Sequence, residues 1–335
     1  AACVARLRAA GAVLIGKTVS SPLAGPGPVK TRNPHDPARN PGTSSSGSAA
    51  AVASGMVPLA IGTQTAGSVI RPASYCGVVG FKPTFGLVPR SGALLQSHTL
   101  DTIGVLARTV EDAALLVDCI AGVDERDQSS LTGSRPALLP IARSEVPLPP
   151  LLAFYKSPFW PTASSAVQDA FGELCEVLGD KIEEVESPML DASLEAQQEV
   201  MAAENAAHYG ALFDEFGAHM SDSLRASIER GRTISAARYL QALGLRDRAN
   251  AVIAEHTRNY SAIVTLAAEG PAPPIAVPFV PNVNGIWTFV GGPAVSLPLI
   301  EVDGLPVGVQ LIGARRDDGR LLRTARWLGT HLATA

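Results

Sequence analysis

Two segments rich in glycine and small hydroxyl residues hold the residue types that could do chemistry. They are residues 42–48 (GTSSSGS) and residues 62–68 (GTQTAGS). Small residues let a backbone turn sharply and direct several N–H groups into one cavity. When a nucleophile attacks a carbonyl group, clustered N–H donors stabilise the oxyanion that forms. A serine that ends such a turn is placed to make that attack, so the two segments favour acyl-transfer chemistry.

Other interpretations of these segments are open. A Gly/Ser run is often a flexible linker, but an Ala-rich stretch that favours helix follows Ser48 directly. Neither segment has the glycine and lysine spacing of a phosphate-binding loop. The Gly-x-Ser-x-Gly elbow is absent around Ser44 and Ser68. His35 and His98 are the only histidines nearby, and neither lies in a recognisable catalytic setting.

Composition excludes several classes of protein. A chain of 335 residues that is 46% hydrophobic and 17% charged can bury a large core, which excludes global disorder. The net charge of −4 shows no basic excess, so we expect no nucleic-acid partner. The longest apolar run, residues 49–62, is interrupted by Ser54, Gly55 and Pro58, so we expect no membrane span. The four cysteines are far apart and form no CxxC pair, which favours a reduced, cytoplasmic protein.

Helices and strands alternate in the pattern that must position these segments. We expect strands at residues 13–15, 59–63, 78–81, 103–106, 262–266, 294–299 and 307–312. We expect helices near residues 1–11, 48–54, 110–120, 167–177 and 321–332, and two or three more within 190–258. Residues 20–48, 122–150 and 270–281 read as loops. The alternation predicts a single large α/β domain with a mixed, mostly parallel central sheet and helices on both faces.

The two segments lie within a longer series of motifs that resembles the amidase signature family. The series comprises residues 32–37 (RNPHDP), 41–52 (PGTSSSGSAAAV), 62–73 (GTQTAGSVIRPA), 80–84 (GFKPT), 100–104 (LDTIG), 292–298 (GPAVSLP) and 304–310 (GLPVGVQ). The resemblance covers both ends of the chain and is weak over residues 125–255. It implies a signature core at residues 1–121, a mostly helical, substrate-shaping insertion at 122–258, and C-terminal strands and a helix at 259–335.

The resemblance implies a site built on two serines and a lysine. The family's nucleophile falls on Ser68, its bridging serine, which follows a cis peptide bond, falls on Ser44, and its oxyanion hole falls on the backbone N–H groups of Thr65, Ala66, Gly67 and Ser68. A serine hydroxyl needs a base to take its proton, and a lysine serves only if it is held neutral. Ser44 can relay the proton because a hydroxyl both donates and accepts. The implied activity is hydrolysis of a small carboxamide to a carboxylate plus ammonia or amine, with neither a metal nor an organic cofactor.

Two departures from the family pattern stand out. Thr43 replaces the glycine that usually precedes the bridging serine. The family's lysine lies several dozen residues before that serine, which places it upstream of Ala1. Of the lysines in the chain only Lys30, in the loop before Ser44, is considered as a substitute. The chain also does not begin with Met, so we expect a fragment of a longer protein and an upstream catalytic lysine, and residues 1–335 alone are expected to lack the base.

The substrate is indicated by Arg71, three residues after Ser68. This spacing is similar to malonamidase-type members, in which an arginine binds a substrate carboxylate, and guanidinium geometry suits that group. A structural ion pair with Asp101 is the equal alternative. Amidotransferase A subunits place arginine one residue earlier and have aspartate where this chain has Gln64, which favours a stand-alone amidase. An A subunit of a tRNA-dependent amidotransferase, an inactive truncated member and a homodimer remain open.

Overall fold

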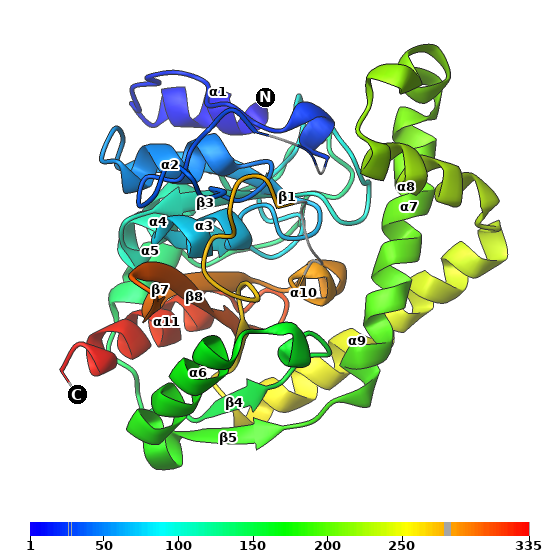
Figure 1. Ribbon diagram of the computed structural model, residues 1–335. Coiled ribbons are helices and arrows are strands. Elements are labelled where there is room, and N and C mark those ends of the chain that lie inside the picture. Colours follow the sequence, from blue (N-terminus) through cyan, green and yellow to red (C-terminus); the bar gives the residue numbers. More distant parts are fainter. Residues whose placement is uncertain (26, 28, 278–282, 335) are drawn as a thin grey trace.

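The computed structural model describes residues 1–25, 27, 29–277 and 283–334 (Figure 1). An eight-stranded sheet runs through these residues in the order β1-β3-β2-β7-β8-β6-β4-β5. Its strands are β1 (Leu59–Gln64), β2 (Val79–Lys82), β3 (Thr102–Ala107), β4 (Leu152–Tyr155), β5 (Ile182–Val185), β6 (Ala262–Leu266), β7 (Ala294–Val302) and β8 (Leu305–Ile312). This confirms a single α/β domain with a mixed sheet.

Eleven α-helices accompany the sheet within the described part of the chain. They are α1 (Ala2–Ala9), α2 (Ser46–Ala53), α3 (Ile70–Cys76), α4 (Val110–Ile120), α5 (Leu138–Arg143), α6 (Ser165–Leu178), α7 (Pro188–Phe216), α8 (Asp222–Thr233), α9 (Ala236–Asn259), α10 (Gly285–Val290) and α11 (Asp318–Leu332). Thr109 caps α4 as its sequence position suggests, because its side chain accepts from the Asp112 backbone N–H. None of these described helices combines the length and apolarity needed to cross a bilayer.

The expectation that the sheet is mostly parallel is wrong. Only the β4–β5 and β4–β6 pairings are parallel, and the other five in the described residues are antiparallel. Helix α3 does connect two strands of the same direction, β1 and β2, but β3 lies between them and runs against both. In the same way β8 lies between β6 and β7. The sequence predicts no helix at α3 or α10, the helices of these two connections. Alternation in the sequence also cannot reveal a strand that inserts between the two connected strands.

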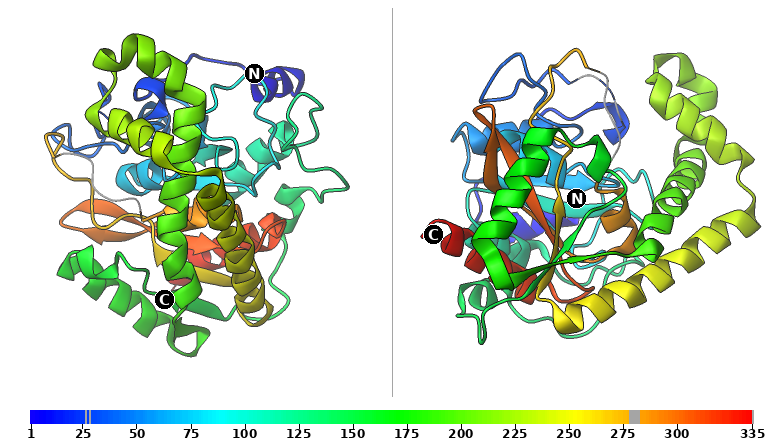
Figure 2. Two further views of the ribbon diagram at one scale, coloured as in Figure 1. Left: turned by 90° about the vertical axis from the view of Figure 1, so that its right-hand side faces the viewer. Right: turned by 60° about the horizontal axis from the view of Figure 1, so that its bottom comes forward.

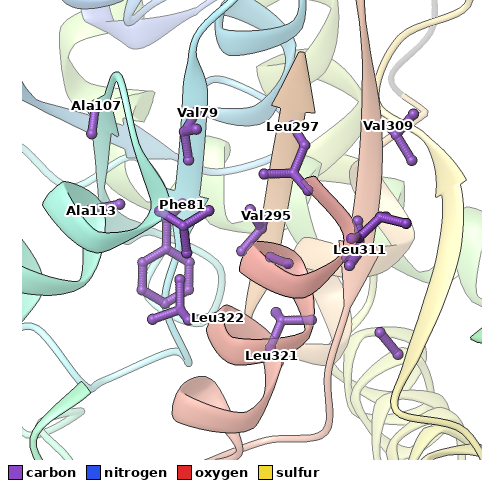
Figure 3. Close-up of a cluster of buried hydrophobic side chains, with 14 of the residues drawn as sticks. Val79, Phe81, Ala107, Ala113, Val295, Leu297, Val309, Leu311, Leu321 and Leu322 are labelled. Atoms are coloured by element: carbon purple, nitrogen blue, oxygen red, sulfur yellow. The ribbon is translucent and has the colours of Figure 1, made fainter. Parts of the chain in front are cut away.

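The sheet is buried on both faces. Along β4, Leu152 and Phe154 join one apolar cluster while Ala153 and Tyr155 join another, as the two-residue period of a strand requires. The first cluster packs β2, β7 and β8 against α4 and α11, and Figure 3 shows Phe81 and Val295 beside Leu321 and Leu322. The second cluster includes residues of α3, α9 and α10. Helices therefore cover both faces, as expected.

Predictions about local structure need correction at several places. Residues 13–15 form no strand, and Val13 and Ile15 are exposed. Residues 11–18 (GAVLIGKT) also have the spacing of a phosphate-binding loop, but the required strand before it and helix after it are absent. Strands β4 and β5 and helices α3, α5 and α10 were not expected, because each is short. Helix α5 therefore corrects the expectation that residues 122–150 form only a loop. The expected loop at residues 270–281 lies partly outside the described residues.

Helices α7, α8 and α9 form an arm along one side of the sheet (Figures 1 and 2). The arm depends on a close approach between α7 and α8 at Gly231. A Cβ atom at Gly231 would lie 1.9 Å from the backbone oxygen of Ala202. Glycine is therefore required there by space, and α8 cannot keep its position against α7 with a larger residue.

We expect Gly231→Ala to lower the free energy of unfolding by about 1–3 kcal/mol, because the two helices must separate to admit the methyl group. Gly244→Ala in α9 is the matched control, since nothing lies within 4 Å of a Cβ atom there. Alanine at that helical position should stabilise by about 0.5–1 kcal/mol. Urea unfolding measures both changes. Equal stability of the Gly231→Ala protein and its parent would contradict the close packing of α7 on α8.

Candidate active site

The second Gly/Ser segment becomes the loop that joins β1 to α3. Its backbone N–H groups at Thr65, Ala66, Gly67 and Ser68 donate to no acceptor among the described residues, and the same residues line a cavity of about 130 Å³. Ser68 lies just before α3 and is partly exposed. Four N–H donors beside a cavity that also holds a serine form a site of the kind that stabilises an oxyanion.

A buried polar network fixes the shape of this loop. The Gln64 side chain accepts from the backbone N–H groups of Val69 and Ile70 at 2.9 and 3.0 Å, so it occupies the start of α3. Its amide nitrogen donates to the Thr288 hydroxyl of α10 at 2.9 Å, and that hydroxyl donates to the Ala66 carbonyl at 2.5 Å. These contacts lie in the interior, where an unmade hydrogen bond is costly. Thr288 is a positioning residue that sequence reasoning missed, because only the fold brings α10 to this loop.

Thr288→Val tests this network. The change keeps the side-chain shape but leaves Gln64 and the Ala66 carbonyl without their partner. We expect kcat to fall by about 10- to 100-fold, because the backbone N–H groups of the loop are no longer held in one orientation. KM should stay within about threefold of the parent value. Thr288→Ser retains the hydroxyl and should restore most of kcat. If Thr288→Val and Thr288→Ser are equally impaired, the hydroxyl does not position the loop.

The first Gly/Ser segment forms hydrogen bonds with β1 and packs closely against α3. Ser45 exchanges hydrogen bonds with the backbone of Thr63 at 3.2 and 3.3 Å, and the Ser48 hydroxyl donates to the Ile61 carbonyl at 2.8 Å. Gly42 has a φ of +95°, and a Cβ atom there would lie 2.5 Å from Pro72. These contacts bring the two Gly/Ser segments together, as the chemistry requires.

Ser44 lies within the first Gly/Ser segment and is 3% exposed. Its hydroxyl has no hydrogen-bond partner among the described residues, whereas the hydroxyls of Ser45 and Ser48 are bonded. The neighbouring Thr43 lines the same cavity as Ser68. The expected cis peptide bond before Ser44 is not found, because the described residues contain no cis peptide bond.

Arg71 of α3 also lines the cavity and is 4% exposed. Burial lowers the pKa of its guanidinium to about 10, and the nearby Tyr75 and Glu269 oppose that shift. At neutral pH the group remains a buried cation. Its Nη1 donates to the Thr43 hydroxyl at 3.4 Å, which links α3 to the first segment.

The alternative ion pair of Arg71 with Asp101 is not formed. The Asp101 carboxylate instead accepts from the Thr65 hydroxyl at 2.5 Å and from the backbone N–H groups of Gln96 and Ser97 at 2.7 and 3.1 Å. Burial raises the pKa of Asp101, and these hydrogen bonds partly offset that rise. Asp101 therefore holds the loop at Thr65, and Arg71 faces the cavity.

Among the described residues, no lysine lines the cavity. Lys17 and Lys30 are exposed, and the buried Lys82 donates to the backbone oxygens of Pro83 and Gly292. Burial lowers the pKa of Lys82 to about 7, with Asp318 acting against the shift. Lys82 thus has the shifted pKa of a potential base, but its contacts place it among backbone carbonyls away from the cavity. Lys30, which is exposed, does not line the cavity and is not supported as a substitute base.

One histidine near the two Gly/Ser segments has a structural contact. His35 contacts the backbone oxygen of Cys76 through Nε2 at 3.0 Å, which is a structural contact. Within the described ranges, no three His, Cys, Asp or Glu side chains gather in a group that could hold a metal ion.

The opposite wall of the cavity comes from the arm. Residues of α7 and α8 line it together with a short turn near the N-terminus. These residues are Ala24, Gly25, Met201, Asn205, Ser223, Leu224 and Ser227, and Gln96 also lines the cavity. None of them was singled out from the sequence, because most lie in the region where motif resemblance is weakest.

The mixed sheet and the N–H groups beside Ser68 place the chain among α/β proteins with a serine at a cavity lined by backbone donors. The chain belongs to the amidase family, whose family model matches residues 1–322. The resemblance stated from the sequence is therefore confirmed.

Individual relatives differ in what they do. One of them is the A subunit of the glutamyl-tRNA(Gln) amidotransferase of Clostridium botulinum (strain Eklund 17B / Type B). The chain is 36% identical to it over 322 residues, which cover 84% of this chain and 65% of that protein. The chain thus spans slightly less than two thirds of that relative.

Solved structures agree with this assignment. A chain from a vestigial protein complex that reveals the evolutionary origins of an s-triazine catabolic enzyme is similar with a TM-score of 0.88 and 30% identity, over 98% of this chain and 76% of that one. A peptide amidase in complex with the competitive inhibitor chymostatin is similar with a TM-score of 0.82 and 27% identity, over 99% and 77%.

Proposed function

We propose that the protein hydrolyses a small carboxamide to a carboxylate plus ammonia or amine. The observation that carries the proposal is the cavity between the arm and the β1–α3 loop, where N–H groups without an acceptor among the described residues lie beside Ser68. Membership of the amidase family supports the reaction class. Ser68 is the nucleophile, Ser44 is the proton relay, and the N–H groups of Thr65, Ala66, Gly67 and Ser68 form the oxyanion hole.

In the proposed mechanism, the Ser68 Oγ attacks the carbonyl carbon while its proton passes to the Ser44 hydroxyl and from there to a base. The carbonyl oxygen becomes an oxyanion that the loop N–H groups stabilise. Collapse of this intermediate breaks the C–N bond, and Ser44 returns a proton to the leaving nitrogen. Water then hydrolyses the ester on Ser68 and releases the carboxylate. The hydroxyl of Ser44, which has no partner among the described residues, supports its role because it is available to both donor and acceptor.

We propose that the base is a lysine that precedes Ala1 in the natural protein. The positions of the lysines within the described part of residues 1–335 support this, since none lines the cavity. The intact mass of the protein from its native source tests it. A mass above 34.7 kDa with a lysine in the additional sequence is expected. A mass of 34.7 kDa would overturn the proposed triad.

We further propose that the substrate carries a carboxylate that Arg71 binds, and that residues 122–258 shape its pocket. The buried cation at the cavity supports the first point and the α7 and α8 lining supports the second. A cytoplasmic location and the absence of a nucleic-acid partner stay predictions.

A second candidate is the A subunit of an amidotransferase that passes ammonia to a partner protein. The 36% identity to such a protein favours it. Gln64 and the position of Arg71 favour the stand-alone amidase. Purification from the native source distinguishes the two, because an amidotransferase component should co-elute with a partner and a stand-alone amidase should not.

Labelling with a fluorophosphonate tests the function of the site directly. The protein from its native source should be labelled covalently, and peptide mass spectrometry should place the label on Ser68. Ammonia release from small carboxamides should stop in proportion to the labelling. Failure to label any serine would favour an inactive family member over an amidase.

A further inference from the structure

Two helices of the arm contribute polar side chains to the lining of the cavity that Ser68 also lines. On α7, Met201 and Asn205 are four residues apart and therefore share a face of the helix. On α8, Ser223 and Ser227 have the same spacing. All four line the cavity together with Ser68 and Arg71, which belong to the opposite wall.

Asn205 is the unusual member of this wall. It is 1% exposed, and its Nδ2 donates to the Ser227 hydroxyl at 2.9 Å. Its Oδ1 is buried and accepts from no donor among the described residues. Most buried amide oxygens in proteins have a partner, and leaving one without a partner is costly. A buried acceptor that lines a cavity therefore indicates a ligand that brings its own donor.

The chemistry of the two walls differs in a way that defines the ligand. Arg71 offers a buried cation on the α3 side, which suits an anionic group. Asn205 offers only an acceptor on the α7 side, which suits an N–H group and gives nothing to an ether or ester oxygen. Of the other arm residues that line the cavity, Met201 and Leu224 are apolar, and neither Ser223 nor Ser227 donates to Oδ1.

We propose that Asn205 Oδ1 accepts a hydrogen bond from a substrate N–H group and so determines specificity. This inference rests on the proposed function and narrows its substrate class. The class is a small amide that places an anionic group at Arg71 and an N–H donor at Asn205. The donor is either the nitrogen of the amide that is cleaved or a second N–H group on the acyl portion.

Binding to a protein that cannot turn over tests the inference. In the full chain with Ser68→Ala, calorimetry compares succinamic acid with monomethyl succinate, which has a similar shape but an ester in place of the N–H. Asparagine, which adds an amino group, is the third ligand. Each is measured again after Asn205→Leu, which removes the acceptor at similar volume.

Two results support the inference and identify the donor. If the cleaved amide supplies it, succinamic acid binds about 10- to 100-fold more tightly than the ester, and Asn205→Leu abolishes the difference. If a second N–H supplies it, amide and ester bind alike, asparagine binds about 10- to 100-fold more tightly, and Asn205→Leu abolishes that gain. Ser227→Ala, which removes only the partner of Nδ2, should change all three ligands by the same factor.

Other results overturn it. An equal change for all three ligands after Asn205→Leu would mean that Asn205 only supports the contact between α7 and α8. If Asn205→Leu fails to fold, the Ser68→Ala chain with Asn205 still decides the question. Equal affinity of that chain for all three ligands would also mean that Asn205 does not determine specificity. Absence of binding would overturn the substrate class. Labelling of Ser68 is independent of these measurements, so failure of the inference and failure of the proposed function are separable.

Discussion

Ser68→Ala is expected to lower kcat by about 10³- to 10⁶-fold, with KM little changed. The reason is that alanine removes the oxygen that forms the bond to the acyl group, while the cavity and its N–H donors remain. The residual rate would come from those donors and from substrate positioning. Steady-state ammonia release from a small carboxamide measures the effect, and the loss of fluorophosphonate labelling provides a second readout.

Ser46→Ala is the matched control for this change. Ser46 is a buried serine whose hydroxyl has no partner among the described residues, and it begins α2 and does not line the cavity. We expect its kcat to stay within about threefold of the parent, since small changes away from a site have small effects. Equal losses in the two variants would mean that Ser68 is not the nucleophile.

Arg71→Met should lower kcat/KM for a carboxylate-bearing amide by about 100-fold or more. Methionine fills much of the buried space but leaves the substrate carboxylate without the cation that faces it. The loss should appear mainly in KM, because the anionic group is bound equally in the ground state and the transition state. Comparing succinamic acid with butyramide measures the part that depends on the carboxylate, and butyramide should lose about tenfold or less.

Two further variants complete this experiment: Arg71→Lys is the conservative substitution and Arg32→Ala is the control at another arginine. Lysine keeps the charge but not the two-pronged geometry of a guanidinium, so we expect an intermediate loss. Arg32 is exposed, and its replacement by alanine should change the kinetics of neither substrate. If Arg71→Met affects succinamic acid and butyramide equally, Arg71 supports the fold through Thr43 and does not bind a carboxylate.

Much of the local structure follows from local sequence. The Ala-rich run after Ser48 forms α2, Thr109 caps α4, and the apolar spacing near the C-terminus forms α11. These features depend on helix propensity, capping and periodicity within a few residues. Short elements such as α10 and β5 were missed, because they are stabilised by packing rather than by their own residues.

The directions of the strands in the sheet cannot be predicted from local sequence. The residues of β3 and β8 indicate strands in either direction equally well. Each inserts between two other strands of the sheet, and pairing partners far apart in the chain decide that choice. A prediction from alternating elements alone therefore gave too many parallel pairs.

The sequence by itself determined the two Gly/Ser segments, their resemblance to the amidase signature family, and Ser44, Ser68 and Arg71 as candidates. Short-range residue patterns carry that information because the chemistry needs those residue types at those spacings. The tertiary structure alone decided that Thr288 bonds to the loop between β1 and α3 and that Asn205 lines the same cavity as this loop. Both depend on contacts across more than a hundred residues of chain, where packing and buried hydrogen bonds, and not sequence periodicity, select the neighbours.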